Sequence, residues 1–273
     1  MNALPGRLVL LGHPVEHSLS PVFQNAALRA AGIPLDYTAC DVAPAELTAA
    51  VARLRTERAA GNVTVPHKER MAGLCDRLTA VARRAGAVNT FWTESANDAT
   101  ALVGDNTDVA GASAALTALL GDQPRGARVV LIGAGGAAAA VLCAFEQWPG
   151  NTVLVRNRHA ERAVALVARF RHVAQCSDDA RDLEDADIVI NATSLGLHAT
   201  DPLPCDPARL RDGVRVFDLV YRPGGTAWVQ AARARGLEAA DGIHMLVEQG
   251  AAAFERWFGI TPDRGVMWRS FQG

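Results

Sequence analysis

The sequence is almost without lysine: 27 of its residues are lysine or arginine, and only Lys68 is a lysine. Arginine stays protonated, whereas burial and neighbouring groups can make a lysine give up its proton. We therefore expect arginine to fill the positions that need only positive charge. Lys68 is then a candidate for a site that needs a transferable proton. The competing interpretation is that one lysine has survived on the surface by chance.

Other absences narrow the class of protein. No apolar run approaches the ~20 residues that a membrane-spanning helix needs, and the first residues do not resemble a secretory signal. No block of basic residues accompanies the net charge of -2, so we expect neither nucleic acid nor a membrane as a partner. The five cysteines show no Cys-x-x-Cys or Cys/His ligand spacing, which predicts a reduced, cytoplasmic protein without a metal site.

Strand-like and helix-like segments alternate along the chain, which predicts an α/β protein with parallel sheets. Ser20 and Pro21 are expected as the N-cap and first residue of the first helix. The turn-rich residues 121–126 form a plausible boundary before a second strand–helix series. The expected strands are residues 7–11, 37–42, 61–65, 88–92, 101–103 (paired with 88–92 across a polar loop at 93–100), 128–132, 152–155, 188–191 and 214–219. The expected helices are residues 20–31, 44–58, 108–120, 137–148, 161–171, 226–235 and 245–258, and a further helical stretch is expected from Pro66 to about residue 85, interrupted near residues 75–78.

A glycine-rich turn predicts a dinucleotide site. The run Gly133-Ala-Gly-Gly-Ala-Ala138 fits the pattern GxGxx[G/A], follows an apolar strand and opens an alanine-rich helix, whose N-terminus favours a pyrophosphate. The next strand ends in Arg156 and Arg158, with Arg162 one turn later, where a reader of a free ribose 2′-hydroxyl is usually an acid. Guanidinium groups suit a 2′-phosphate, so NADP is predicted over NAD. The alternatives are an ordinary glycine turn and a solvated basic helix start.

Polar residues gather where the predicted strands of the first half end, in Ser18-Leu-Ser20, Asn62-Val-Thr-Val-Pro-His-Lys68 and Gly104-Asp-Asn-Thr-Asp108. Each motif alone is typical of turns and caps, but together, beside a nucleotide motif, they indicate a small-molecule site. Hydride transfer to a ketone creates an oxygen that needs a proton and positive charge. We therefore expect Lys68 to donate that proton and Asp108 to orient Lys68, although the sequence alone does not show that the two residues meet.

In their order along the chain these motifs resemble the shikimate dehydrogenase family over nearly the whole length, together with Gly86-Ala-Val-Asn-Thr90, Asn191-Ala-Thr-Ser194 and Asp241-Gly-Ile-His-Met-Leu-Val-Glu-Gln249. The resemblance implies NADPH-dependent, reversible reduction of 3-dehydroshikimate to shikimate, within aromatic amino acid (chorismate) biosynthesis. It also implies an α/β substrate-binding domain at residues 1–107, a Rossmann-type NADP-binding domain at residues 108–241, and a C-terminal helical segment at residues 242–273 that returns to the first domain.

The resemblance also implies roles for single residues. Lys68 and Asp108 match the catalytic pair of the family. Contacts with the substrate are implied at Ser18, Ser20, Thr64, Asn89, Tyr221 and Gln249, and contacts with NADP at Gly133, Ala134, Gly135, Gly136, Ala137, Asn157, Arg158, His159, Arg162, Thr193, Ser194 and Gly242. No metal is expected, the partner is a small molecule, and the chain is expected as a monomer or homodimer.

Some positions depart from the family pattern. His159 stands where threonine is usual, which removes a hydroxyl contact with the 2′-phosphate, and His13 and His244 replace a common asparagine and a frequent glycine. The alternatives are a dehydrogenase of quinate or another cyclic hydroxy acid, a folate-linked relative, and a nucleotide-binding regulatory protein without turnover. Quinate-using relatives tend to have threonine at the position of Ser20, and NAD-using ones an acid at the position of Arg158. The Ser-Leu-Ser-Pro motif does not suit a folate substrate.

Overall fold

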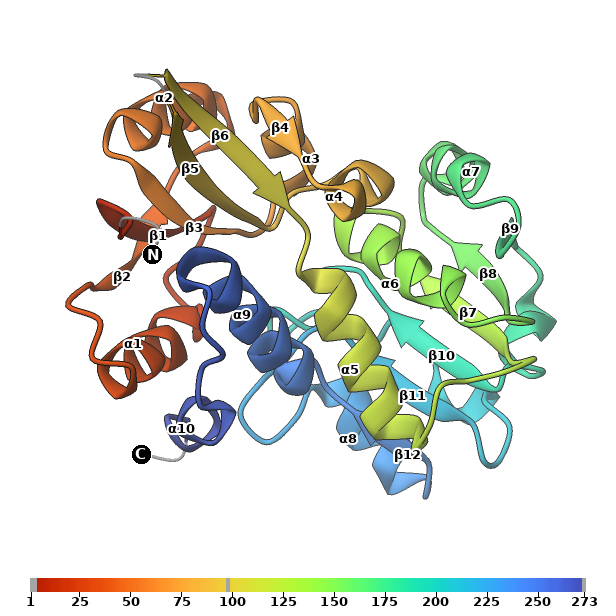
Figure 1. Ribbon diagram of the computed structural model, residues 1–273. Coiled ribbons are helices and arrows are strands. Elements are labelled where there is room, and N and C mark those ends of the chain that lie inside the picture. Colours follow the sequence, from red (N-terminus) through yellow and green to blue (C-terminus); the bar gives the residue numbers. More distant parts are fainter. Residues whose placement is uncertain (1–3, 97–98, 272–273) are drawn as a thin grey trace. The chain divides into compact units, whose positions relative to one another are not determined.

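The computed structural model describes residues 4–96 and 99–271, and the chain divides into two compact units (Figure 1). Unit 1 comprises Met1–Gly111 and Leu246–Gly273, and unit 2 comprises Ala112–Met245. The chain enters unit 2 within helix α5 (Asp108–Leu120) and leaves it within helix α9 (Ile243–Phe258). Each unit has its own sheet with helices, so the predicted α/β class is confirmed.

The sheet of unit 1 has the strand order β2-β1-β3-β5-β6-β4. Strand β1 is parallel to β2 and β3, β5 runs antiparallel to β3 and β6, and β6 therefore runs in the same direction as β3. The ends of β1, β3 and β6 and the start of β5 consequently lie at one edge of the sheet. The strands are β1 (Arg7–Gly12), β2 (Tyr37–Asp41), β3 (Ala59–Val63), β4 (Arg77–Leu78), β5 (Thr90–Ala96) and β6 (Ala99–Asp105).

Helices cover both faces of this sheet, as the apolar run of β1 requires. Leu8 and Leu10 pack into a cluster with residues of α1 (Ser20–Ala30), α9 and α10 (Arg264–Arg269), while Val9 and Leu11 pack with residues of α2 (Leu47–Thr56) and α3 (Lys68–Ala72) on the other face. Successive residues of a strand point to opposite faces, so a strand that is buried on both sides is apolar throughout. Helix α4 (Ala80–Ala85) adds Ala82 to the second cluster.

The predicted N-cap of the first helix is wrong. Helix α1 begins at Ser20 itself, and Leu19, which precedes it, already has helical dihedral angles and makes no side-chain cap. The hydroxyl of Ser18 instead accepts a hydrogen bond of 3.2 Å from the Ser20 main-chain N–H. The capping bond is therefore displaced by two residues, and Pro21 lies in the first turn, where its missing N–H costs nothing.

The sheet of unit 2 is parallel throughout, in the order β12-β11-β10-β7-β8-β9. Counted from β7, this is the 3-2-1-4-5-6 order of the dinucleotide-binding fold, which binds ligands at the carboxyl ends of the strands, where the order reverses between β7 and β10. The strands are β7 (Arg128–Ile132), β8 (Thr152–Arg156), β9 (Ala174–Cys176), β10 (Ile188–Asn191), β11 (Arg215–Asp218) and β12 (Glu238–Ala240), and the helices are α6 (Gly136–Glu146), α7 (Ala160–Arg169) and α8 (Ala227–Ala234).

The sequence patterns missed the shortest elements, namely β4, β9, β12, α10 and the 3-10 helices η2 (Ala180–Leu183) and η3 (Pro207–Arg209). The helix predicted at 44–58 begins as a 3-10 helix, η1 (Pro44–Glu46), and continues as α2. The predicted loop at 93–100 is also wrong where the structure describes it, because β5 and β6 stay paired as far as Ala96 and Ala99. Residues 97–98 of that loop lie outside the described residues. Among the helices of the described chain, none combines the length and apolar character needed to cross a bilayer.

Candidate active site

Lys68 and Asp108 lie together in unit 1, at the end of the sheet where β1, β3 and β6 end. Lys68 opens α3 after β3, and Asp108 opens α5 after β6. The Lys68 Nζ donates to Asp108 Oδ2 at 2.6 Å, and the exposed fractions of the two side chains are 18% and 5%. A hydrogen bond between two charged groups is short and strong, and this one lies largely out of water. The sheet topology thus joins two residues that stand 40 positions apart in the chain.

Asn89 fixes the other oxygen of Asp108. The Asn89 Oδ1 accepts the Thr107 main-chain N–H at 2.7 Å, and its Nδ2 donates to Asp108 Oδ1 at 2.8 Å and faces the Oε1 of Gln249 at 3.2 Å. Because the Thr107 N–H can only donate, the orientation of the amide is determined. The Lys68 carbonyl accepts the Val88 N–H at 2.9 Å, which ties Lys68 to the same segment.

The bonds leave Lys68 with spare donors. An ammonium group has three N–H bonds, and among the described residues only Asp108 accepts one of them, so two remain for an oxygen of a bound molecule. Both Asp108 oxygens already accept hydrogen bonds, so that side chain is held in one orientation. The pair can therefore present a proton, with its position fixed, to an oxygen beside Lys68. The structure brings Asn89 and Gln249, two of the predicted substrate residues, into this cluster.

The remaining predicted substrate residues divide between the two units. Ser18 and Ser20 follow β1, and Thr64 follows β3, so all three lie on segments that leave the strand edge that also carries Lys68. Thr64 is held there by its main-chain N–H, which donates to the Leu11 carbonyl at 2.8 Å. Tyr221 belongs to unit 2, where it follows β11. The roles of these residues in binding stay predictions.

The glycine-rich turn of unit 2 has the features that a pyrophosphate needs. Gly133 has φ +122°, and a Cβ there would lie 2.7 Å from the carbonyl oxygen of Ala192, so only glycine fits. Gly135 precedes α6, whose first turn has no side-chain cap and no acidic residue. The N–H groups at that end are therefore available to an anion, and the helix dipole favours one. The residues present fit the predicted dinucleotide.

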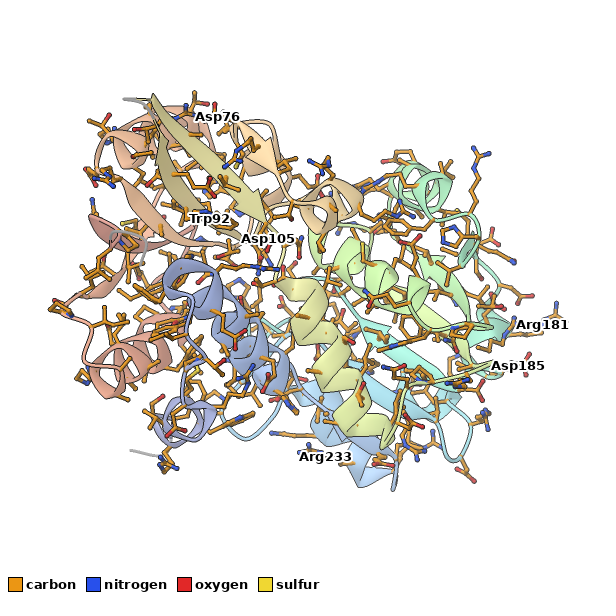
Figure 2. All side chains as sticks on the ribbon, viewed as in Figure 1. Asp76, Trp92, Asp105, Arg181, Asp185 and Arg233 are labelled. Atoms are coloured by element: carbon orange, nitrogen blue, oxygen red, sulfur yellow. The ribbon has the colours of Figure 1, made fainter. Side chains whose placement is uncertain are left out.

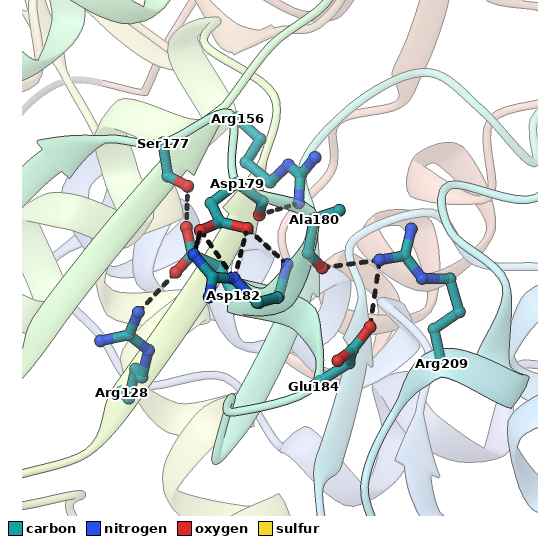
Figure 3. A network of polar contacts seen from close by, with 9 residues as sticks. Arg128, Arg156, Ser177, Asp179, Ala180, Asp182, Glu184 and Arg209 are labelled. Carbon is teal, nitrogen blue, oxygen red and sulfur yellow. Dashed lines mark hydrogen bonds and ion pairs between the residues drawn. The ribbon is translucent and has the colours of Figure 1, made fainter.

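At the end of β8, two of the predicted arginines, Arg156 and Arg158, differ in their surroundings. The Arg156 guanidinium donates to the main-chain carbonyl of Asp179 at 3.0 Å, within a network of ion pairs and hydrogen bonds around η2 (Figure 3). Arg156 therefore anchors the segment after β9, whereas Arg158 is exposed. The Asn157 side chain donates to the carbonyl of His159 at 2.8 Å, and this bond shapes the loop that leads into α7. His159 precedes α7 and does not cap it.

A buried polar network that the sequence patterns missed supports Thr193. Asn191 Oδ1 accepts the main-chain N–H of Thr193 at 3.0 Å and its hydroxyl at 2.7 Å, while Asn191 Nδ2 donates to Asp218 Oδ1 at 2.8 Å. Asp218 also accepts the Val220 N–H at 3.0 Å and the Thr226 hydroxyl at 2.7 Å. Burial raises the pKa of Asp218 to about 6, against the opposing effect of these bonds. The sequence feature that could have pointed to this network is Asp218, a carboxylate at the end of the apolar strand β11.

Gly242 has a packing reason for being glycine. A Cβ there would lie 2.1 Å from the carbonyl oxygen of Leu219, and the Gly242 N–H donates to the Val220 carbonyl at 3.1 Å. Its predicted contact with the cofactor stays a prediction. Within residues 4–96 and 99–271, no group of three or more His, Cys, Asp or Glu side chains is arranged to hold a metal ion.

Three family models match successive parts of the chain. The model described as shikimate dehydrogenase substrate binding domain matches residues 10–91, shikimate / quinate 5-dehydrogenase matches residues 116–200, and shikimate 5′-dehydrogenase C-terminal domain matches residues 242–270. A curated relative, shikimate dehydrogenase (NADP(+)) of Rubrobacter xylanophilus, is 45% identical over 272 residues, which cover 97% of this chain and 94% of the relative.

Solved structures are similar over nearly the whole chain. Shikimate 5-dehydrogenase from Thermus thermophilus, in complex with NADP(H) and shikimate, has a TM-score of 0.86 and 34% identity and covers 99% of both chains. Quinate dehydrogenase from Corynebacterium glutamicum, in complex with NAD, has a TM-score of 0.86 and 29% identity, again over 99% of both chains. The fold is thus shared by proteins with two different substrates and two different cofactors.

Proposed function

The chain belongs to the shikimate dehydrogenase family, and on this premise we propose that it interconverts 3-dehydroshikimate and shikimate with NADPH and NADP⁺. The observation that carries the proposal is the hydrogen-bonded pair of Lys68 and Asp108, 2.6 Å apart and largely buried in unit 1. The NADP-dependent relative at 45% identity supports the choice of substrate and cofactor.

Lys68 moves the proton of the reaction. In the reductive direction its ammonium donates to the oxygen of the substrate ketone, and in the oxidative direction the neutral amine accepts the proton of the hydroxyl. Asp108 orients Lys68 through the hydrogen bond between them. Bound NADPH supplies the hydride for reduction, and NADP⁺ accepts it in the oxidation. Hydroxyl and amide groups suit the hydroxyls and carboxylate of the ligand, and those proposed to bind it are Ser18, Ser20, Thr64, Asn89, Tyr221 and Gln249.

Unit 2 holds the cofactor. We assign its pyrophosphate to the turn from Gly133 to Ala137 and to the uncapped N-terminus of α6. The 2′-phosphate is assigned to the tip of β8 and the first turn of α7, where an exposed guanidinium can make charge-assisted bonds. The residues proposed there are Asn157, Arg158, His159 and Arg162, and those on the nicotinamide side are Thr193, Ser194 and Gly242.

Initial rates with four substrate–cofactor pairs test this function. Shikimate and quinate are each assayed with NADP and with NAD, and reduced cofactor is followed by its absorbance. We expect the highest kcat/KM for shikimate with NADP. A preference for quinate with NAD would instead indicate an activity like that of quinate dehydrogenase from Corynebacterium glutamicum. Absence of cofactor reduction with all four pairs would favour a regulatory, nucleotide-binding role.

A further inference from the structure

Asp105 is a buried carboxylate that the proposed reaction does not use. It ends β6, where Figure 2 labels it, and only 2% of its side chain is exposed. In the sequence it precedes Asp108 by three residues. Its Oδ1 accepts the Asn106 main-chain N–H at 2.8 Å and the Thr79 hydroxyl, and its Oδ2 accepts the Nε of Arg256 at 2.7 Å. A carboxylate out of water is costly unless hydrogen bonds and an opposite charge satisfy it, and here Arg256 provides that charge.

The turn after Asp105 is bonded to the segment before β5 at successive residues. The Asp105 carbonyl accepts the Asn89 N–H at 3.1 Å, and the Asn106 side chain donates to the Ala87 carbonyl at 2.9 Å. The Asn89 side chain then holds Asp108 at 2.8 Å. Because these bonds follow one another along the two segments, a displacement of Asp105 is transmitted to Asp108.

Helix α9 contacts both parts of this arrangement. Gln249 and Arg256 are seven residues apart, which is about two helical turns, so they lie on one face of α9. Gln249 accepts from Asn89 at 3.2 Å, and Arg256 donates to Asp105 at 2.7 Å. One helix therefore fixes the amide and the carboxylate that together determine where Asp108 lies.

We propose that Arg256 is a positioning residue for Asp108 and acts through Asp105. The inference rests on the proposed function, in which Asp108 orients Lys68. Arg256 keeps 54% of its side chain exposed, so its loss opens little space in the core but leaves a buried carboxylate without a counter-charge. Without Arg256, the turn relieves that cost by moving Asp105 toward water, and Asp108 moves with it. A misplacement of about 1 Å at a reacting group lowers a rate about 100-fold.

The test compares Arg256→Gln with the double variant Asp105→Asn/Arg256→Gln in the full chain. We expect the single variant to lose about 10-fold to 100-fold in kcat for shikimate oxidation, with KM for NADP unchanged. The double variant, which has no buried charge to balance, should recover most of that kcat. Arg264→Gln is the matched control, because Arg264 is likewise a partly exposed arginine that pairs with a carboxylate: its Nε lies 2.9 Å from Glu248 of α9, and 38% of its side chain is exposed. Its kcat should stay that of the wild type.

The outcomes separate the inference from the proposed function. An active wild type with an equally active Arg256→Gln variant would overturn the positioning role, and so would a folded double variant as impaired as the single one. Equal losses of kcat in the Arg256 and Arg264 variants would mean that α9 has only a structural role, and would overturn the positioning role as well. A wild type that oxidises no shikimate would contradict the proposed function instead. If Arg256→Gln does not fold, the double variant decides alone: activity supports the role and a folded, inactive protein refutes it.

Discussion

Replacing Asp218 with asparagine should change how the free energy of unfolding depends on pH. Burial raises the pKa of Asp218 to about 6 from a reference value of 3.8, so the folded chain binds more protons than the unfolded chain between these two values. The wild type therefore loses stability as the pH rises through this window and loses no more above it. The full shift corresponds to roughly 3 kcal/mol, of which about 2 kcal/mol falls between pH 4.5 and 7.5.

Asparagine keeps the shape and removes the charge. Its carbonyl oxygen can still accept the bonds from Asn191 and Val220, and its amide can donate to Thr226. Urea unfolding followed by circular dichroism at pH 4.5 and at pH 7.5 should show the variant gaining about 2 kcal/mol on the wild type between the two conditions. Asp178→Asn, at an exposed position of the same unit, is the control and should show no such change. A pH-independent difference for the Asp218 variant would refute the reasoning.

Two further variants probe the cofactor site. Arg158→Gln should raise KM for NADP at least about 10-fold, since a hydrogen bond to a charged group contributes ~1.5–3 kcal/mol. KM for NAD, which has no 2′-phosphate, should stay unchanged. Equal changes in KM for both cofactors in initial-rate assays would place the 2′-phosphate elsewhere. Gly133→Ala should weaken NADP binding in a fluorescence titration, because the new Cβ would meet the Ala192 carbonyl oxygen at 2.7 Å. Gly213→Ala, where φ is +79° but nothing lies within 4 Å of the new Cβ, should bind NADP like the wild type, and a Gly133 variant that does the same would refute the close contact.

The sequence predicts those parts of the site that depend on local pattern and strand direction. Polar residues that follow β3 and β6 are expected near one ligand site because strand ends carry such sites. That Lys68 and Asp108 meet within hydrogen-bond distance is shown only by the structure. Ser20 was misassigned because the helix starts one residue earlier than its Ser-Pro signal indicates.

Contacts between distant segments could not be predicted in this way. The sequence around Asp105 does not indicate that Arg256, 151 residues later, balances its charge, because this contact depends on where α9 packs in unit 1. Asn191 and Asp218 likewise pair only because β10 and β11 are neighbours in one particular register. Periodicity and spacing describe single elements, whereas these contacts are set by how the elements pack.

The proton-transfer role of Lys68 is tested by one comparison, the kcat for shikimate oxidation at saturating NADP in the wild type and in Lys68→Arg. The variant keeps the positive charge beside Asp108, but a guanidinium does not release its proton at neutral pH. The proposal predicts a loss of about 100-fold to 10,000-fold in kcat with little change in KM, because binding persists while the proton acceptor is gone. A Lys68→Arg variant with the kcat of the wild type would contradict it.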